Sequence, residues 1–263
     1  MCEKTQELDH QEALRHHVAM IILPGLTSTK KERIPAFLDD LRRSDVRLVA
    51  LFPTMLGKVE RLALYRELET IPGLKVPHVH LRSDCGGDEI EYLMTRLGAE
   101  VFNVHPRAST HPFGPLPALH AHRIFIENVE VPAEDAEFEG VDGLKPGGMC
   151  PDFSHLENAR VHGKSSYVNT VMSQLQRVPM GCCHVSAIRT GVPNQWSGEW
   201  DHHEFATLDD LTYLEGYLEY LPETWVSLEL ENCLEQQLLA ADWLENLQKR
   251  SPPSTSALSM SRL

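Results

Sequence analysis

Residues 46–81, VRLVALFPTMLGKVERLALYRELETIPGLKVPHVHL, hold the pattern that decides the fold. A strand-like stretch at 46–52, apolar throughout from Leu48 to Phe52, ends at a proline. Residues 58–69 have helical spacing and stop before Pro72-Gly73, and residues 75–81 alternate. Continuous apolar runs are typical of strands buried on both faces, and Pro or Gly commonly follows the end of a helix. The stretch therefore predicts a strand, a helix and a second strand parallel to the first.

The same rhythm extends over most of the chain. Further strands are expected at 18–23, 100–105, 123–131, 149–153, 181–188 and 225–230, further helices at 30–43, 88–97, within 157–176, at 208–220 and at 234–248, and loops at 132–148 and 191–203. Four prolines interrupt the pattern at 106–122, so the helix between strands four and five is expected to be short or missing. Eight strands with intervening helices predict an α/β fold, a single (β/α)8 TIM barrel.

The barrel is expected to occupy residues 18–250 as one domain. Residues 1–17 would form an N-terminal extension, and the polar residues 251–263 a disordered tail. A length of 263 residues suits one α/β barrel, and 42% hydrophobic residues suffice for a sizeable core. No run approaches the roughly 18 apolar residues of a membrane span, and the polar N-terminus lacks the apolar segment of a signal peptide.

The cysteines and the net charge narrow the class of protein. Six cysteines show no CxxC pair and no disulfide-framework spacing, which predicts reduced thiols in a cytoplasmic protein. The net charge is −14, and no cluster of Lys and Arg of the kind that binds duplex phosphates is present. The acidity counts against a nucleic-acid partner without excluding one, since a locally positive metal cleft can lie in an acidic protein.

Acids and histidines fall at or just after the ends of the apolar runs. A barrel collects its strand ends on one face, so we expect these residues to converge there and bind divalent metal. The candidate ligands are His78, His105, Glu127, Asp152, His155, His184, Asp201, His203 and Glu229. His80 remains open as an alternative to His78, and Glu231 as an alternative to Glu229.

Two carboxylates stand out because each lies inside an apolar strand. Glu127 follows Ile124-Phe125-Ile126, and Glu229 lies within Val226-Ser227-Leu228-Glu229-Leu230. A carboxylate in such a setting is costly unless it is paired or bound to a cation. Strand alternation puts Glu231 on the same side as Glu229, and Glu229 is preferred as the inward group.

The order of these motifs resembles a known superfamily. The motifs are Pro77-His78, Asn103-Val104-His105-Pro106, Ile126-Glu127-Asn128, Asp152-x-x-His155, His184 at a strand end, Asp201-x-His203 and Leu228-Glu229. Together they are similar to the xylose isomerase-like TIM barrels, which include endonuclease IV and many sugar isomerases and epimerases. The resemblance spans residues from about 18 to 248.

The resemblance implies a ligand set. Glu127, Asp152, His184 and Glu229 match the four ligands of the single-metal isomerases and epimerases. The other five candidates match the extra ligands with which endonuclease IV holds three zinc ions. The chain departs from endonuclease IV after its DxH motif, where Glu204-Phe205-Ala206-Thr207 replaces a glycine-containing turn, and the loops after strands two and three are not clearly basic. These departures put DNA binding in doubt more than metal binding.

Two mechanisms follow from the resemblance. In a hydrolase, two or three zinc ions about 3.5–4 Å apart would activate a water against a small sugar or phosphorylated substrate, with Glu127 bridging two ions. In a sugar or sugar-phosphate isomerase or epimerase, one Mn²⁺ or Mg²⁺ would hold the substrate while Glu127 and Glu229 act as catalytic base and acid. The number of histidines favours zinc.

Other expectations concern partners. Arg189, just past His184, and His111, in the Pro-rich segment, are candidate substrate-binding residues. A small-molecule sugar or phosphoester is the expected partner, without a membrane, and cleavage of abasic-site DNA ranks behind it. A barrel that has lost catalysis and serves as a binding protein ranks last, because the candidate ligands are all present.

Overall fold

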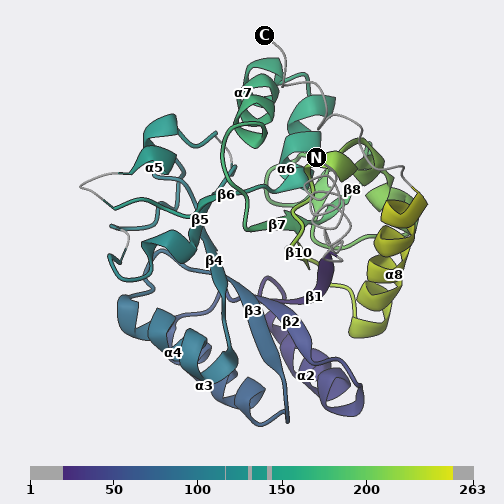
Figure 1. The fold of residues 1–263 in the computed structure, drawn as a ribbon. Coiled ribbons are helices and arrows are strands. Elements are labelled where there is room, and N and C mark those ends of the chain that lie inside the picture. The colour runs from purple at the N-terminus through teal and green to yellow at the C-terminus, as the bar shows by residue number, and fades with distance from the viewer. Residues whose placement is uncertain (1–19, 116, 130–131, 141–143, 251–263) are drawn as a thin grey trace, which may run out of the picture.

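The computed structural model describes residues 20–115, 117–129, 132–140 and 144–250 and shows a nearly closed barrel of eight parallel strands (Figure 1). The sheet order is β6-β5-β4-β3-β2-β1-β10-β7, and bridges from Met149 to Met180 and from Asp152 to His184 connect its two edges. In chain order the strands are β1 (Ile21–Thr27), β2 (Leu48–Phe52), β3 (Lys75–His80), β4 (Val101–Val104), β5 (Ile124–Glu127), β6 (Gly148–Cys150), β7 (Cys182–Val185) and β10 (Trp225–Leu228). The predicted TIM barrel is confirmed.

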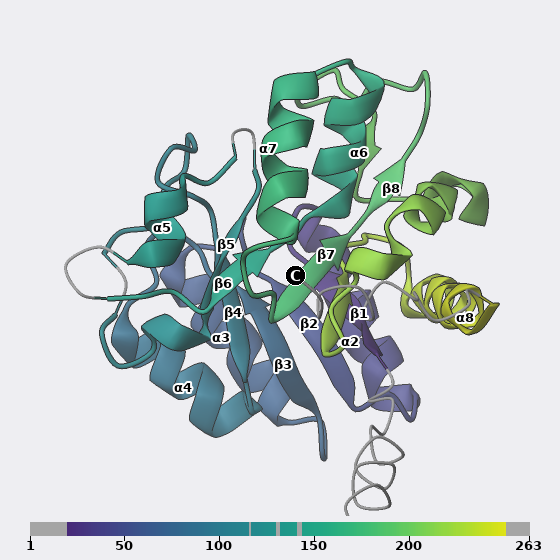
Figure 2. The ribbon, with the colours of Figure 1, turned by 45° about the horizontal axis from the view of Figure 1, so that its top comes forward.

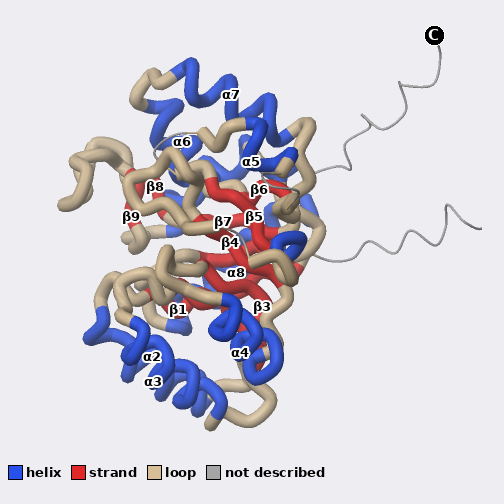
Figure 3. The backbone as a smooth tube through the Cα atoms, turned by 90° about the vertical axis from the view of Figure 1, so that its left-hand side faces the viewer, coloured by secondary structure: helices blue, strands red, loops and turns tan. Residues whose placement is uncertain are grey.

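Helices surround the barrel, as Figures 2 and 3 show with the strands inside and α2, α3 and α4 on the opposite side from α6 and α7. The α-helices are α2 (Ile34–Arg43), α3 (Lys58–Glu69), α4 (Gly87–Leu97), α5 (Asp135–Glu139), α6 (Phe153–Val161), α7 (Ser165–Leu175) and α8 (Leu234–Arg250). The 3-10 helices are η1 (Lys31–Arg33), η2 (Ala121–Arg123), η3 (Leu208–Gly216) and η4 (Leu218–Tyr220).

The unit at 46–81 that predicts the fold forms β2, α3 and β3 nearly as expected. Its outward-facing strand residues, such as Val49 and Val79, belong to the main hydrophobic core with the helices. Residues that alternate with them face the barrel interior, where Ala50 and Phe52 form a separate small cluster with Leu23. The interior is therefore filled by side chains below the mouth, as in other closed eight-stranded barrels.

The first strand differs from its prediction. A strand is expected at 18–23, before Pro24-Gly25, but β1 continues through this pair to Thr27. Up to Pro24 the strand is paired with β10, and from Gly25 onward with β2. A Cβ on Gly25 would lie 2.0 Å from the Leu228 carbonyl oxygen, so glycine permits this close approach. The start of the expected strand lies outside the described residues, as do the extension 1–17 and the tail 251–263.

The connection between β4 and β5 has only one short helical element among its described residues, η2, which agrees with the missing helix predicted there. The loop expected at 132–148 was wrong in one respect, because α5 lies within it. Strand six ends at Cys150 rather than at 153, since Asp152 caps α6. A break around Gly163, whose φ is +71°, divides the expected helix at 157–176 into α6 and α7.

Two further departures lie after β7. The expected strand 181–188 divides into β7 and β8 (Ala187–Ile188), and β8 pairs antiparallel with β9 (Asp201–His202), inside the expected loop 191–203. The helix expected at 208–220 forms as the 3-10 helices η3 and η4. The β8–β9 hairpin stands beside the barrel mouth and carries Asp201, so this irregular segment bears on the site.

Candidate metal centre

Acids and histidines gather where the parallel strands end. His80 is the last residue of β3, Glu127 the last of β5, and His184 lies in the second half of β7, while His105 and Glu229 directly follow β4 and β10. The carboxyl ends of parallel barrel strands open on one face. Three groups of possible metal-binding atoms result there, and within each group all the atoms lie within 4.8 Å of one another.

The first group joins His80, His105 and Glu127. Nε2 of His80 lies 2.9 Å from Oε2 of Glu127, and the rings of His80 and His105 are 4.9 Å apart at 87°. Burial lowers the pKa of His105 to about 4. That ring is therefore neutral near pH 7 and offers a nitrogen lone pair to a cation.

The second group joins Asp152, His184 and Glu229, all buried. Nδ1 of His184 lies 3.4 Å from Glu229 Oε2 and 4.0 Å from Asp152 Oδ2. The same nitrogen is 3.7 Å from Glu127 Oε2. Both ring nitrogens of His184 and Oδ2 of Asp152 are buried without a hydrogen-bond partner. Buried polar atoms are nearly always paired, so Nδ1 of His184 and Oδ2 of Asp152, which lie 4.0 Å apart, fit the coordination of a cation.

Hydrogen bonds from the start of α6 fix one carboxylate oxygen of Asp152, and the other oxygen faces the candidate metal centre. Oδ1 accepts hydrogen bonds from the backbone N–H of Ser154 at 2.8 Å and of His155 at 3.0 Å, as an N-cap side chain does. The backbone N–H of Asp152 donates to Asn128 Oδ1 at 2.7 Å. The DxxH spacing therefore places Asp152 at the cap and His155 in the first turn of the same helix.

The third group extends from Glu127 and Asp152 to His155. Nε2 of His155 lies 3.5 Å from Asp152 Oδ2 and 4.0 Å from Glu127 Oε1, while Nδ1 lies 3.3 Å from Asp201 Oδ2. His155 and, to a smaller extent, His203 lower the pKa of Asp201, and His203 also lowers the pKa of Glu229. Burial opposes this effect, yet His203 and His184 bring the pKa of Glu229 down to about 2.

The charges in the centre depend on one another. Burial raises the pKa of Glu127, but His184 and His80 outweigh burial and hold that pKa well below its usual range. Burial lowers the pKa of His184, but Glu127 and Glu229 outweigh it and raise that pKa to about 9. In the metal-free protein, protons on histidines therefore balance the buried carboxylates. A divalent cation can take over that role.

Glu229 and Glu231 are separated although strand alternation predicts a common side. Strand β10 ends at Leu228, and beyond it Glu231 turns to Lys30, whose Nζ lies 2.6 Å from Glu231 Oε2. Glu229 stays with His184 at the mouth. The structure therefore brings Glu229, the preferred alternative, into the centre.

His78 lies one layer deeper in the barrel than the three groups. Its Nε2 lies 3.0 Å from Asn103 Oδ1 and its Nδ1 lies 2.7 Å from Ser227 Oγ. Asn103 Nδ2 donates to Glu127 Oε2 at 2.6 Å. Because a carboxylate only accepts, the amide oxygen of Asn103 faces His78, so Nε2 of His78 carries the hydrogen. His78 thus helps to orient Glu127 through Asn103, and His80 occupies the position beside Glu127.

A fourth group of possible ligands lies around His78 inside the barrel. It comprises His78, Cys150 and Cys182, all fully buried and within 4.8 Å of one another. Cys150 and Cys182 form a small apolar cluster with Phe125. Both nitrogens of His78 already have hydrogen-bond partners, so this group is an internal packing layer. The five cysteines among the described residues are free thiols, as the spacing predicts.

Two predicted substrate-binding residues lie outside the three groups. His111 is exposed, and its Nδ1 lies 3.0 Å from Thr110 Oγ1. Arg189 directly follows β8, is half-buried, and its backbone N–H donates to the Trp200 carbonyl at 2.9 Å. His111 lies in the connection between β4 and β5 and Arg189 at the end of β8, and their contact with substrate stays a prediction.

Sequence reasoning gave no role to Asn103 and preferred His78 to His80. A signal for Asn103 was available, since a buried amide two residues before His105 faces the same interior. A signal for His80 was its place at the end of the alternating run, where the other candidates also stand. His80 and His78 face the same interior but lie at different depths along the strand. Strand alternation predicts the face of a residue and does not predict its depth.

Comparisons with known protein-family models, with curated proteins and with solved structures gave no significant match. Every helix within the described ranges is too short or too polar to cross a lipid bilayer. The barrel and the groups at its mouth are therefore the features from which a function can be inferred.

Proposed function

We propose that this protein is a zinc-dependent hydrolase of the xylose isomerase-like type, which acts on a small phosphoester or sugar substrate with two or three ions at the barrel mouth. The observation that carries the proposal is that buried atoms of His184 and Asp152 have no hydrogen-bond partner and lie beside Glu127 and Glu229. Imidazole nitrogens suit zinc, and the proposed set is rich in them. Its members are His80, His105, Glu127, Asp152, His155, His184, Asp201, His203 and Glu229.

Glu127 is suited to hold two cations at once. Its Oε2 faces His80 and His184, and its Oε1 faces His155. Asn103 Nδ2 donates a hydrogen bond of 2.6 Å to Glu127 Oε2, which fixes the orientation of the carboxylate. When bound, the ions would neutralise a phosphoester and lower the pKa of a water molecule.

In this proposal, other residues of the protein bind the ions or orient the ligands. Burial keeps His105 neutral near pH 7, so it binds without first losing a proton. The first turn of α6 orients His155, and the β8–β9 hairpin orients Asp201. Arg189 and His111 stay candidate contacts for the substrate. The net charge of −14 favours a small substrate over a duplex with many phosphates.

A single-metal isomerase or epimerase is the second candidate. It is favoured by the burial of Glu127, Asp152, His184 and Glu229, which contrasts with the half-buried His155. One Mn²⁺ or Mg²⁺ held by the four buried residues would leave Glu127 and Glu229 to exchange a proton with a keto-sugar. Metal content separates the two proposals.

The proposed function is tested by elemental analysis and by activity on matched substrates. We expect two or three zinc ions per chain, and cleavage of bis-p-nitrophenyl phosphate or of a p-nitrophenyl monoester that a chelator abolishes and zinc restores. Abasic-site DNA and a panel of ketoses complete the assay. One manganese or magnesium with ketose epimerisation would replace the hydrolase by the isomerase. Absence of metal and of both activities would defeat both proposals.

Substitutions in β3 should separate a ligand from a residue of the layer below it. His80→Ala should lower the zinc content by about one ion, because His80 faces Glu127 directly. His78→Ala should keep the zinc number at saturating zinc but lower the free energy of unfolding by about 2–4 kcal/mol, through a cavity and two unpaired partners. Elemental analysis and urea unfolding measure both effects. An equal loss of zinc in the two variants would contradict the assignment of His80.

A further inference from the structure

The side chain of Gln237, on α8, joins β1 to residues 229–233, here called the Glu229 segment. It is fully buried, and its Oε1 accepts a hydrogen bond of 2.7 Å from the Gly25 backbone N–H. Its Nε2 donates to the Gly25 carbonyl at 3.0 Å, to the Leu230 carbonyl at 2.8 Å and to the Asn232 carbonyl at 2.9 Å. One amide group therefore bonds both polar backbone groups of Gly25 and two carbonyls of the segment that follows β10.

Gln237 takes the place of strand pairing at a point where β1 and β10 are no longer paired. Up to Pro24, β1 pairs with β10, but β10 ends at Leu228, and from Gly25 onward β1 pairs with β2. The Glu229 segment belongs to no helix or strand. A glutamine amide offers the same kinds of donor and acceptor as a peptide group, so it can satisfy strand backbone beyond the end of the neighbouring strand. Gln237 therefore holds the Glu229 segment against β1 as another pair of strand residues would.

The Glu229 segment carries one of the candidate ligands. The Glu229 backbone N–H donates to the Val185 carbonyl at 2.9 Å, and the Glu229 carboxylate lies 3.4 Å from His184 Nδ1. Leu230, whose carbonyl accepts from Gln237, is the next residue in the chain. Glu229 is therefore fixed by β7 through its own N–H and by α8 through the residue that follows it.

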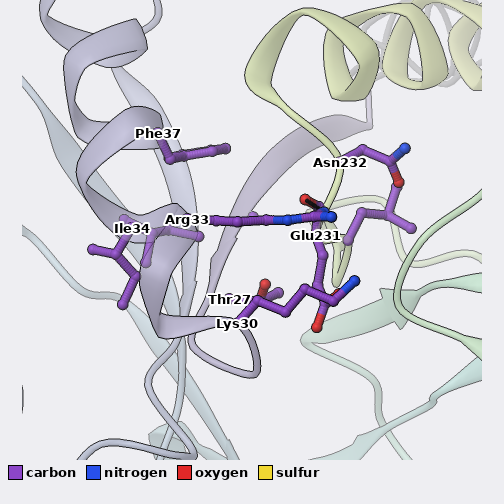
Figure 4. Close-up of a pocket in the computed structure, with 10 residues that line it drawn as sticks. Thr27, Lys30, Arg33, Ile34, Phe37, Glu231 and Asn232 are labelled. Atoms are coloured by element: carbon purple, nitrogen blue, oxygen red, sulfur yellow. Dashed lines mark hydrogen bonds and ion pairs between the residues drawn. The ribbon is translucent and has the colours of Figure 1, made fainter. Parts of the chain in front are cut away.

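A pocket beside the Glu229 segment leaves part of it without close packing. The pocket lies between η1 and the end of β10 and is lined by residues of β1, of α2 and of the Glu229 segment. Figure 4 shows Lys30 and Arg33 extending toward Glu231 and Asn232 across this pocket. The Lys30 side chain is 33% exposed, so water weakens its ion pair with Glu231. The buried hydrogen bonds of Gln237 are therefore the firmer support of the segment.

We propose that Gln237 is a positioning residue that holds Glu229 at a cation bound by Glu229, Asp152 and His184. The ligand atoms of these three residues lie within 4.8 Å of one another, and Gln237 acts on them through the backbone of the Glu229 segment. The inference rests on the proposed metal-dependent function and deepens it. It holds for the zinc hydrolase and for the single-metal isomerase, because Glu229 belongs to both ligand sets. Loss of the Gln237 amide releases the Glu229 segment from β1 and weakens the binding of that cation selectively.

The test compares Gln237→Met with Gln174→Met in the full chain. Gln174 is the matched control because it is also a buried glutamine, on α7, and it donates to the Ala133 carbonyl rather than to the Glu229 segment. Methionine keeps the length of the side chain and removes the amide, so both variants lose buried hydrogen bonds. Zinc binding to metal-free protein is measured by equilibrium dialysis, with circular dichroism as a check on folding. We expect the dissociation constant of one zinc ion to rise about 10- to 100-fold in Gln237→Met, typical of the loss of an outer support, and to keep its wild-type value in Gln174→Met.

A second measurement does not need metal. In metal-free Gln237→Met, amide hydrogen exchange at Glu229 should become faster relative to exchange at Val226 inside β10, because only the segment after β10 is released. Gln174→Met should keep the wild-type ratio of the two exchange rates, since it removes a hydrogen bond elsewhere in the protein.

If Gln237→Met fails to fold, Gln237→Asn keeps the amide but shortens the side chain by a single methylene, and it should show the same selective weakening. A zinc affinity in the folded variant equal to that of Gln174→Met, or an unchanged ratio of exchange rates, would overturn the inference while the proposed function stands. If the wild type binds no zinc, the zinc hydrolase is defeated and dialysis against manganese repeats the comparison for the isomerase. Absence of both metals from the wild type would defeat the proposed function and the inference together.

Discussion

Replacement of Glu127 by Gln should reduce the zinc content to at most one ion and lower hydrolytic activity by more than about 100-fold. Loss of a residue that only supports a ligand typically lowers metal affinity 10- to 100-fold, and Glu127 is proposed to contact two ions directly. The substitution keeps the shape of the side chain and removes its charge. It leaves His184 and His80 without the carboxylate that each faces in the barrel. Elemental analysis and cleavage of bis-p-nitrophenyl phosphate measure the result.

Glu137→Gln is the matched control for this prediction. Glu137 is also a buried glutamate, but it lies on α5 and accepts a hydrogen bond from the Arg107 backbone N–H at 3.2 Å. Burial raises the pKa of Glu137, whereas histidines lower the pKa of Glu127. We expect normal zinc content in Glu137→Gln. Full zinc content in folded Glu127→Gln would remove the bridging role and with it the multi-zinc proposal.

The parts of the fold that sequence predicted are those with local signals. The boundaries of α3 agree with the prediction, because an apolar strand and a proline precede it and Pro72-Gly73 follows it. The error in β1 has the opposite cause. Whether Pro24 and Gly25 end a strand or lie inside it depends on β10, β2 and Gln237 of α8, which donates to the Gly25 carbonyl at 3.0 Å. Those partners are distant in sequence.

The candidate site shows the same division between local and distant information. Alternation puts both His78 and His80 inside the barrel, but which of them reaches the mouth depends on the stagger between neighbouring strands. Glu229 and Glu231 are likewise separated only because β10 ends before both of them, at Leu228, and Lys30 attracts Glu231. The two-residue period of a strand thus predicts whether a side chain faces the barrel interior or the helices. How deep that side chain lies along the barrel is decided by the stagger of the strands when the sheet closes.

Metal-free and zinc-loaded protein should respond to pH in opposite directions between about pH 6.5 and 9. Glu127 and Glu229 raise the pKa of His184 to about 9, against the opposing effect of burial. A histidine whose pKa is higher in the folded state stabilises the protein below its unfolded pKa, near 6.5. That stabilisation is lost as the pH rises through 9. For His184 the loss amounts to about 3 kcal/mol, so the Tm of metal-free protein should fall over this range.

Zinc binding should strengthen over the same range, because zinc must displace the protons from its histidine ligands. Asp152 and Asp201 also raise the pKa of His155 well above its usual range, although burial opposes them. One proton on His184 and one on His155 therefore compete with the metal near pH 7. Each released proton raises the apparent affinity about tenfold per pH unit. Below pH 6.5 the trend of the metal-free protein reverses, since burial lowers the pKa of His105 to about 4. Its stability should therefore be greatest near pH 6.5.

The measurement is the Tm with excess zinc and with chelator at pH 6.5, 7.5 and 8.5, together with zinc affinity by competition with a chromogenic chelator. The gap between the two Tm values should widen as the pH rises. His184→Gln should reduce the pH slope of the affinity by one proton, whereas His120→Gln should leave it unchanged, because His120 pairs with Glu91 at 3.4 Å outside the centre. A zinc affinity that stays flat from pH 6.5 to 9 would mean that protons and metal do not compete for His184. The buried carboxylates would then be neutralised in some way other than by a cation at the barrel mouth.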